Sequence, residues 1–356
     1  MESIATQSFS VHFNITAYEK LNAYLIDNCF SSVFVLVDRN THAYCLQSFM
    51  MKLTTDIHIE IIEIEVGEMY KTIDTCVGVW NALSELGADR KSLLINLGGG
   101  VVTDLGGFVA CTFKRGIKYM NVPTSLLAMV DASVGGKTGV DLGVLKNQIG
   151  VVNSGDMVII DTSFLDTLPQ HQLKSGLAEM LKHGLIDDRD YWKQLTDLSQ
   201  FALQDLDQLI YDSIIIKKNI IIKDPFEANE RKYLNFGHTL GHAIESHFLN
   251  AIDKSALLHG EAIAIGMVLE CYLSVMLLNF PKKDCDEVKN VMFKIFGHVE
   301  IPSTDYDAII NLMKYDKKNE HGNVNFVLLR EIGKPQIDCV VENKLIMEAF
   351  AYYSQL

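Results

Sequence analysis

Two short apolar runs in the first half of the chain are typical of strands that are buried on both faces of a sheet. They are SVFVLVD at Ser32–Asp38 and SLLINL at Ser92–Leu97, and turn residues bound each of them. Strands of this kind belong to parallel sheets, which need crossover helices between successive strands. Thr72–Leu86, which lies between the two runs, has apolar residues at helical spacing and is followed by Gly87. This alternation predicts a doubly wound α/β fold.

The second half of the chain has longer segments at helical spacing. They cover residues 176–185, 205–223, 235–248, 261–278 and 306–314, and a pair of short strands at 325–329 and 336–341 resembles an isolated hairpin. Further strands are expected in the first half at 58–66, 119–122 and 157–161. At 356 residues the chain is long enough for two hydrophobic cores. We therefore expect a Rossmann-like α/β domain over residues 1–160 and a mainly α-helical, metal-binding domain over residues 161–356.

The composition excludes several classes of protein. The chain is 48% hydrophobic and 21% charged, as in a soluble globular protein, and it has no run of about 18 uncharged apolar residues that would suggest a membrane span. Its start, Met1–Asn14, lacks the basic and apolar regions of a signal peptide, and its seven cysteines include no Cys-x-x-Cys pair. We expect a cytoplasmic protein. The net charge of −14 argues against nucleic acid as a partner.

A glycine turn follows the second strand directly. Gly98, Gly99 and Gly100 precede a possible helix start that contains Thr103 and Asp104. Backbone amides at such a helix end can approach a pyrophosphate, so a nucleotide site is one interpretation. A simple tight turn is the other, because Thr103 stands where the Gly-x-Gly-x-x-Gly pattern has its third glycine. Asp38 ends the first strand, where it could bind ribose hydroxyls or cap a helix.

Three histidines and a glutamate form a candidate metal site. His238 and His242 are four residues apart and share one face of a predicted helix. His259 begins the next helical segment, and Glu179 lies in an earlier apolar helix. Both histidines of the pair could bind a metal, or one could bind while the other moves protons. Three or four such ligands would make a catalytic zinc site with an open position, whereas any one histidine alone is more often structural.

Cationic side chains lie in or beside the glycine-rich and histidine-bearing segments. They are Arg115, Lys137, Lys146, Lys182, Lys217, Arg231, Lys317 and Lys318. Taken singly, each lysine is expected to be a solvated surface charge. Charges farther apart than about 8 Å are largely screened at physiological salt, so a few clustered cations could still bind an anionic substrate despite the acidic net charge.

These segments occur together in an order that resembles the 3-dehydroquinate synthase family. The motifs are Arg115–Gly116, Asn121–Asp131, Gly135–Gly139, Gly176–Gly184, Asn235–Glu245, His259–Met267 and Asp316–Lys318. This is a family of sugar phosphate cyclases within the fold group that includes glycerol dehydrogenase. The resemblance runs from about Asp38 to Lys318 and rests on the whole series of motifs.

The resemblance implies a role for each matching residue. Glu179, His238 and His259 would hold Zn²⁺ or Co²⁺, and His242 would face the substrate. NAD would contact Asp38, Glu68, Lys71, Gly99, Gly100, Thr124 and Ser125, with Asp104 and Lys146 on the same side. The substrate would be surrounded by Asp131, Lys137, Asn147, Lys182, Lys217, Arg231, Asn235 and Lys317 or Lys318. Arg115 would reach the substrate phosphate of a neighbouring subunit, which implies a homodimer.

The resemblance also implies a reaction of the shikimate pathway. The family converts 3-deoxy-D-arabino-heptulosonate 7-phosphate to 3-dehydroquinate by transient oxidation with NAD, phosphate elimination, reduction and aldol closure. Relatives that make other carbocycles alter residues matching Asp131, Lys137, Asn235 or His242, and all four are retained here. The alternatives are another sugar phosphate cyclase, a catalytically idle NAD-binding protein and a polyol dehydrogenase. The many lysines argue against the last, because a neutral polyol needs no such cations.

Overall fold

The computed structural model describes residues 1–6, 9–143, 145–196, 203–251, 254–313 and 324–355. They form two compact units, Met1–Leu173 and Lys174–Leu356, whereas the sequence analysis expected the change after residue 160. The intervening segment packs with the first unit. Tyr18 donates a hydrogen bond of 2.6 Å to Asp161, and Phe164 and Leu165 of the following 3₁₀ segment are buried.

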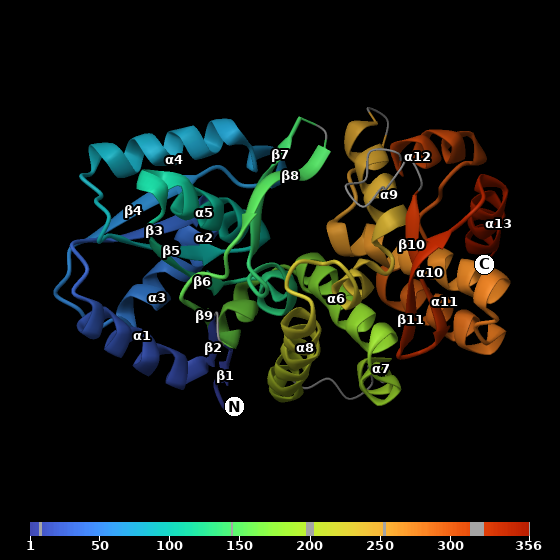
Figure 1. Cartoon of the computed structure of the whole chain (residues 1–356), viewed down its shortest axis with the longest axis horizontal. Helices are drawn as coiled ribbons and strands as arrows, with labels where there is room; N and C mark the ends of the chain where they lie inside the picture. Colours follow the sequence, from blue (N-terminus) through green and yellow to red (C-terminus); the bar gives the residue numbers. More distant parts are fainter. Residues whose placement is uncertain (7–8, 144, 197–202, 252–253, 314–323, 356) are drawn as a thin grey trace. The chain divides into compact units, whose positions relative to one another are not determined.

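The first unit is built on a seven-stranded sheet, coloured blue to green in Figure 1. In spatial order its strands are β1 (Ile4–Ala5), β2 (Ser10–Phe13), β9 (Met157–Ile160), β6 (Lys118–Pro123), β5 (Leu93–Gly98), β3 (Val33–Asp38) and β4 (Ile59–Ile64). Among the described strands of this sheet, β1 and β2 pair antiparallel, and every other neighbouring pair is parallel. The predicted parallel sheet is therefore confirmed, with β1 and β2 added at an edge that the sequence analysis did not identify.

Helices cover both faces of this sheet (Figure 1). They are α1 (Asn14–Asn28), the short α2 (Arg39–Thr41) and α3 (Gln47–Met51), α4 (Ile73–Glu85) and α5 (Gly100–Thr112). Leu83 of α4 and Leu105 of α5 share one buried core cluster with Phe34 and Leu36 of β3, whereas α1 contacts β2 and β9. The doubly wound α/β fold is thus confirmed. A separate antiparallel hairpin, β7 (Lys137–Leu142) and β8 (Leu145–Val152), packs on α5.

The second unit is mainly helical, as predicted. Its helices are α6 (Gln170–Ile186, which begins just before the boundary), α7 (Arg189–Thr196), α8 (Leu203–Lys223), α9 (His238–Asn250), α10 (His259–Leu278), α11 (Lys282–Phe296), α12 (Tyr306–Leu312) and α13 (Asn343–Ser354). The predicted hairpin is β10 (Asn325–Glu331) paired antiparallel with β11 (Lys334–Val340). The helices α7, α11 and α13 were not predicted from the sequence.

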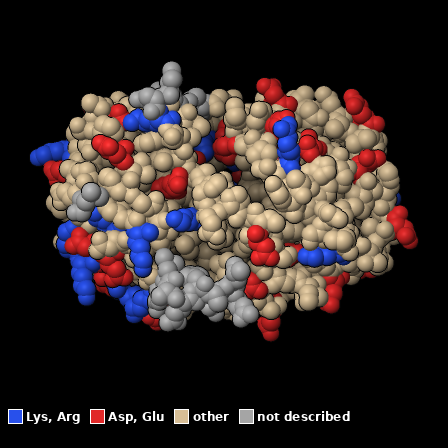
Figure 2. All heavy atoms as spheres, turned by 180° about the vertical axis from the view of Figure 1, so that it is seen from behind, with Lys and Arg blue, Asp and Glu red and all other residues tan. Residues whose placement is uncertain are grey.

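The central helix of this unit is α10, which contacts α9, α11, α13 and β10. By length and composition it could cross a membrane, but 67% of its most apolar window is buried inside the protein. A core helix of a globular domain has the same properties, and α10 also carries Glu261 and Glu270. On the face drawn in Figure 2, lysine and arginine are interspersed with aspartate and glutamate, and no continuous basic surface is visible there among the described residues.

Candidate active site

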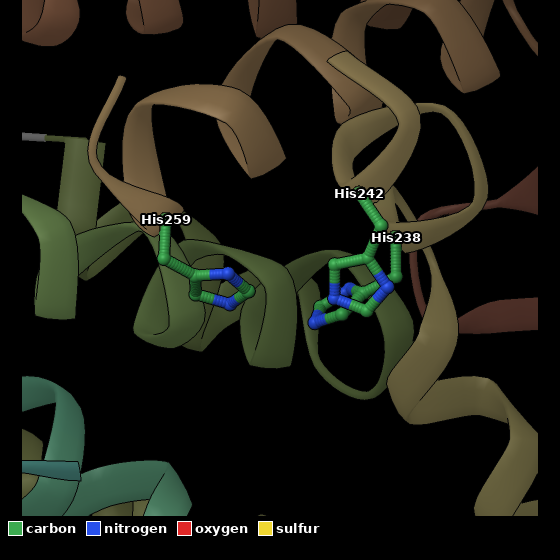
Figure 3. A group of neighbouring side chains, drawn as sticks. All are labelled: His238, His242 and His259. Atoms are coloured by element: carbon green, nitrogen blue, oxygen red, sulfur yellow. The ribbon is translucent and has the colours of Figure 1, made fainter. Parts of the chain in front are cut away.

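The three histidines selected from the sequence lie together in the second unit (Figure 3). His238 and His242 stand one turn apart on α9, and His259 is the first residue of α10. Each offers a ring nitrogen, and these atoms all lie within 4.8 Å of one another. Glu179 of α6 completes the group, with a fully buried side chain.

The carboxylate of Glu179 faces two of the imidazoles. Its Oε1 lies 3.5 Å from Nε2 of His238 and 3.5 Å from Nε2 of His259. This is longer than an ordinary hydrogen bond, which measures about 2.7–3.2 Å. It matches the separation of about 3.4 Å between neighbouring ligands of a tetrahedral zinc ion with bonds of about 2.1 Å. These three donors therefore fit a divalent metal.

The opposite nitrogens of both rings have acceptors that fix their orientation. Nδ1 of His238 lies 3.1 Å from the carbonyl oxygen of Phe236, and Nδ1 of His259 lies 3.2 Å from Oε2 of Glu245. A carbonyl oxygen cannot donate, so Nδ1 of His238 carries a hydrogen, and in the neutral ring Nε2 is the nitrogen that can bind a metal. Metal-binding histidines commonly have such partners. Glu245 is seven residues after His238 on the same helix face, a spacing that could have identified it from the sequence.

The carboxylates of Glu179 and Glu245 lie beside two basic side chains, His259 and Lys182. Burial alone would lower the pKa of His259, but the carboxylates of Glu245 and Glu179 outweigh it and raise the pKa to about 10. Nζ of Lys182, which is itself buried, donates to the second oxygen of Glu179. His259 therefore carries a proton at neutral pH when no other cation lies between the two carboxylates.

A close approach of α6 and α10 brings Glu179 to His259. The amide of Gly260 donates a hydrogen bond of 2.9 Å to Oγ of Ser175. A Cβ at residue 260 would overlap the carbonyl oxygen of Ser175 and lie 2.7 Å from its carbonyl carbon, so only glycine fits without movement. Ser175 stands one turn before Glu179, and Gly260 follows His259 directly. The contact therefore sets the distance between these two candidate ligands.

In the first unit, the candidate nucleotide residues line the carboxyl edge of the sheet. β5 ends at Gly98, Gly99 caps α5, and Gly100 is the first residue of α5. The amide of Thr124, which follows the adjacent β6, donates to the carbonyl of Gly98 at 3.0 Å. Asp38 ends β3 on the other side of β5. Dinucleotides bind at this edge of open α/β sheets.

Asp38 also caps a helix, which was the alternative interpretation of this residue. Its Oδ1 accepts the amide of Thr41 at 2.8 Å, and the Thr41 side chain accepts the amide of Asp38 at 2.9 Å. The two bonds form a capping box that holds the turn after β3. The cap fixes the Asp38 carboxylate at the end of the strand, so it is compatible with a binding role.

Lys71 is the centre of a polar network in the first unit. Its Nζ donates to Oδ2 of Asp104 and to Oδ1 of Asn147, both at 2.6 Å. Glu68 lies 3.9 Å from Lys71 and 3.4 Å from Lys146. Burial alone would lower the pKa of Lys71, but the carboxylates of Asp104 and Glu68 outweigh it and raise the pKa, so the lysine is charged. Asn147, expected on the substrate side, thus contacts residues expected on the cofactor side.

Two family models match the chain over most of its length. The model of the 3-dehydroquinate synthase N-terminal domain matches residues 61–175, and the model of the C-terminal domain matches residues 176–319. The chain belongs to the 3-dehydroquinate synthase family. The 3-dehydroquinate synthase of Parabacteroides distasonis is 40% identical over 342 residues, which cover 94% of this chain and 95% of the relative.

Solved structures confirm the dehydroquinate synthase-like fold. A 2-deoxy-scyllo-inosose synthase, complexed with carbaglucose-6-phosphate, NAD⁺ and Co²⁺, superposes with a TM-score of 0.82 at 26% identity and 99% coverage of both chains. A 2-epi-5-epi-valiolone synthase from Streptomyces hygroscopicus, with NAD⁺ and Zn²⁺ bound, gives 0.84 at 24% identity, covering 100% of this chain and 99% of the other. The second comparison supports the fold alone.

Two further family positions of the second unit, Arg231 and Asn235, lie just before the start of α9. Arg231 is buried in the 3₁₀ segment Glu230–Asn235, where its Nη1 donates to the carbonyl of Pro225 at 2.6 Å. Its amide donates to Asp224 at 3.1 Å, and Nδ2 of Asn235 donates to Glu227 at 2.8 Å. These bonds hold the loop that connects α8 to α9. Lys317 and Lys318 lie outside the described residues.

Burial contradicts one expectation about the lysines. Each lysine of the cationic set was expected to be solvated, yet Lys182 and Lys217 are only 1% and 6% exposed. Lys71, which was not in that set, is buried as well, at 4%. The sequence could not reveal this, because each side chain is buried by helices or strands distant in the chain. Lys137, by contrast, is exposed at the start of β7, and Asp131 lies half-buried in the π-helical segment Ala128–Ala132.

Arg115 is the last residue of the 3₁₀ segment Phe113–Arg115, which follows α5. It is exposed and follows Lys114 in a turn where both residues have left-handed backbone angles, with φ of 70° and 49°. Non-glycine residues adopt this conformation rarely, which makes the turn a candidate functional feature.

Proposed function

We propose that this protein converts 3-deoxy-D-arabino-heptulosonate 7-phosphate to 3-dehydroquinate and inorganic phosphate, acting as a phosphate lyase. The observation that carries the proposal is the carboxylate of Glu179, buried and 3.5 Å from the Nε2 atoms of His238 and His259, in a chain of this family. A metal-binding centre of this kind suits a substrate whose hydroxyl must lose a proton before oxidation. The first unit would bind NAD, and the second would bind the metal and most of the substrate.

Glu179, His238 and His259 would hold the divalent metal, either zinc or cobalt. Bound there, the metal would polarise a substrate hydroxyl, and NAD would take up and return a hydride. The neighbouring solved cyclase carries NAD⁺ and Co²⁺, which supports the choice of cofactors. His242 offers a ring nitrogen to the same centre, and we assign it, as the family resemblance implies, to the substrate side, where its ring can accept or donate a proton.

The carboxyl edge of the sheet would bind NAD. The backbone of Gly99 and Gly100, at the positive end of α5, suits the pyrophosphate, and Asp38 suits a ribose hydroxyl. The other proposed contacts are Glu68, Lys71, Asp104, Thr124, Ser125 and Lys146. Lys71 would act through its charge, which its bonds to Asp104 and Asn147 hold in one position.

Cationic and amide side chains would bind the carboxylate and phosphate of the substrate. We assign this role to Lys137, Asn147, Lys182, Lys217, Arg231, Asn235 and Lys317 or Lys318, with Asp131 as a further polar contact. The planar guanidinium of Arg231 suits bidentate recognition of a carboxylate, and its bond to Pro225 would orient it. Phosphate would then be held while the bond to it breaks, which is how positioned cations accelerate an elimination.

We further propose a cytoplasmic homodimer in which Arg115 reaches the substrate phosphate of the neighbouring copy. The exposure of Arg115 and its constrained turn support a contact outside its own chain. Apolar side chains on the β7–β8 hairpin, Leu142 and Val152, are 54% and 59% exposed and could be covered by a second copy. All seven cysteines are free, as expected in a reducing compartment.

A single incubation tests the proposed reaction. Enzyme with heptulosonate phosphate and substoichiometric NAD should release one inorganic phosphate per turnover without net NADH. The same assay with glycerol should give no NADH. The matched control is a His259→Ala variant, which should bind no metal and release no phosphate. Accumulation of NADH in proportion to substrate consumed, without phosphate release, would mean that the protein is a dehydrogenase.

A further inference from the structure

Glu270 is a buried carboxylate that the proposed reaction does not use. It lies in α10, eleven residues after His259, and its side chain has no exposed surface. Its Oε2 accepts a hydrogen bond of 2.6 Å from the amide of Gly237, and its Oε1 accepts one of 3.4 Å from the amide of Leu240. Both amides belong to the N-terminus of α9, whose first residue is the candidate ligand His238.

The N-terminus of α9 needs such a partner. The first amides of a helix have no acceptor within the helix, and a side chain at the preceding residue commonly supplies one. Here that residue is Gly237, which has no side chain. A carboxylate supplies the missing acceptor and is also stabilised by the positive end of the helix dipole. Glu270 therefore caps α9 from a neighbouring helix.

The packing of α10 on α9 explains why Glu270 reaches this point. Gly266 stands one turn before Glu270 on the same face of α10. A Cβ at residue 266 would overlap the carbonyl oxygen of Gly237 and lie 2.8 Å from the amide nitrogen of Gly241. The two helix backbones are thus in direct contact at Gly266, and the next turn of α10 faces the open amides of α9.

We propose that Glu270 is a positioning residue of the metal centre. By capping α9 it holds the first turn of that helix, so that His238 and His242 keep their orientation toward His259 and Glu179. Because α10 begins with His259, one helix supplies a ligand and also fixes the helix that supplies His238. This inference rests on the metal site of the proposed function.

Loss of the cap affects the ligands directly. Gly237 connects Phe236, whose carbonyl accepts Nδ1 of His238, to the first residue of the helix. An uncapped first turn frays, and the ring of His238 then loses both its orientation and its 3.5 Å approach to Glu179. A purely structural role for Glu270 would instead lower the stability of the unit and leave the metal affinity of the folded protein unchanged.

Metal affinity of the full-length chain separates the two roles. Metal-free protein is titrated with Zn²⁺ against a chromophoric chelator, and the absorption spectrum of the Co²⁺-loaded protein reports the ligand geometry. The variants are Glu270→Ala, Glu270→Gln and Glu270→Met, with Ser274→Ala as the matched control. Ser274 is buried one turn later on α10, donates to the carbonyl of Glu270 at 2.6 Å and accepts the amide of Leu329 at 2.9 Å. Its loss should destabilise α10 without uncapping α9.

We expect Glu270→Ala to weaken zinc binding by about 10- to 100-fold, as losses of partners around metal ligands do, and to change the Co²⁺ spectrum. Glu270→Gln should lose less affinity, because its amide oxygen can still accept from Gly237. Ser274→Ala should melt at a lower temperature with wild-type zinc affinity and spectrum.

The outcomes distinguish this inference from the proposed function. Wild-type affinity and spectrum in Glu270→Ala would overturn the positioning role, and if that variant does not fold, the same result in Glu270→Met, which has no oxygen to accept either amide, would do so. A wild-type chain that binds no zinc, or a His259→Ala chain that retains it, would overturn the metal site itself.

Discussion

Replacing Gly260 with alanine tests whether the contact between α6 and α10 sets the metal centre. The added Cβ would lie 2.5 Å from Cα and 2.7 Å from the carbonyl carbon of Ser175. Non-bonded carbons prefer about 3.5 Å or more, so the two backbones must separate by about 1 Å. Since Ser175 and Glu179 share one face of α6, the shift moves Glu179 away from His259.

The expected cost has two parts. Forcing an extra carbon into a close-packed site costs about 1–3 kcal/mol, and weakening the hydrogen bond from the Gly260 amide to Ser175 costs about 1 kcal/mol. We therefore expect the free energy of unfolding to fall by about 2–4 kcal/mol. The affinity for zinc should fall by about tenfold or more, because a displaced carboxylate no longer shares one ion with both histidines.

Urea denaturation measures the first quantity, and zinc titration of the metal-free protein measures the second. Gly78→Ala is the matched control, because Gly78 lies inside α4 and an added Cβ there meets nothing within 4 Å. That control should gain about 0.5–1 kcal/mol from the better helix propensity of alanine. The reasoning fails if Gly260→Ala is as stable as the wild type and binds zinc equally well.

Three further predictions use other parts of the structure. Chelation should abolish activity, with zinc or cobalt restoring it, and metal analysis should find none in His259→Ala. Lys71→Met leaves Asp104 as a partly buried carboxylate without its lysine and should lower stability by about 3 kcal/mol in denaturant melts; adding Asp104→Leu should recover part of the loss. Burial alone would raise the pKa of Asp161, but hydrogen bonds from Lys52, Ser163 and Tyr18 outweigh it and lower the pKa. The Asp161 carboxylate should therefore stabilise the folded protein above pH of about 4, and this stabilisation should be lost as the pH falls through the folded-state pKa. Thermal melts of Asp161→Asn across the same pH range should lack this dependence.

Local sequence patterns predicted most of the elements. The runs that became β3 and β5 are apolar throughout, and α4 follows its predicted segment, because both faces of a central strand and one face of a covering helix must be apolar. The strand β2, which lies between the edge strand β1 and β9, was not identified, since a run of four residues that includes His12 carries no distinctive pattern. The helices α11 and α13 form from amphipathic segments late in the chain, and these segments were not predicted to be helical.

The contacts of the candidate metal ligands could not be predicted from the sequence either. Helical spacing joined His238 to His242, but it could not determine which of them faces Glu179, because that depends on how α6 packs against α9. Nothing in the sequence singled out Glu270, since a lone glutamate in an apolar helix has no visible partner. Its role becomes apparent only where α10 contacts the start of α9.

The sequence by itself determined the fold class, the family and the chemical types available for the site. Those properties depend on the order of residues along the chain, through strand and helix periodicity and the series of motifs. Only the tertiary structure decided which groups meet: the contact of Gly260 with Ser175, the 3.5 Å spacing about Glu179, and the burial of Lys71 and Lys182. These are distances between elements far apart in sequence, and the packing of whole helices and strands fixes them.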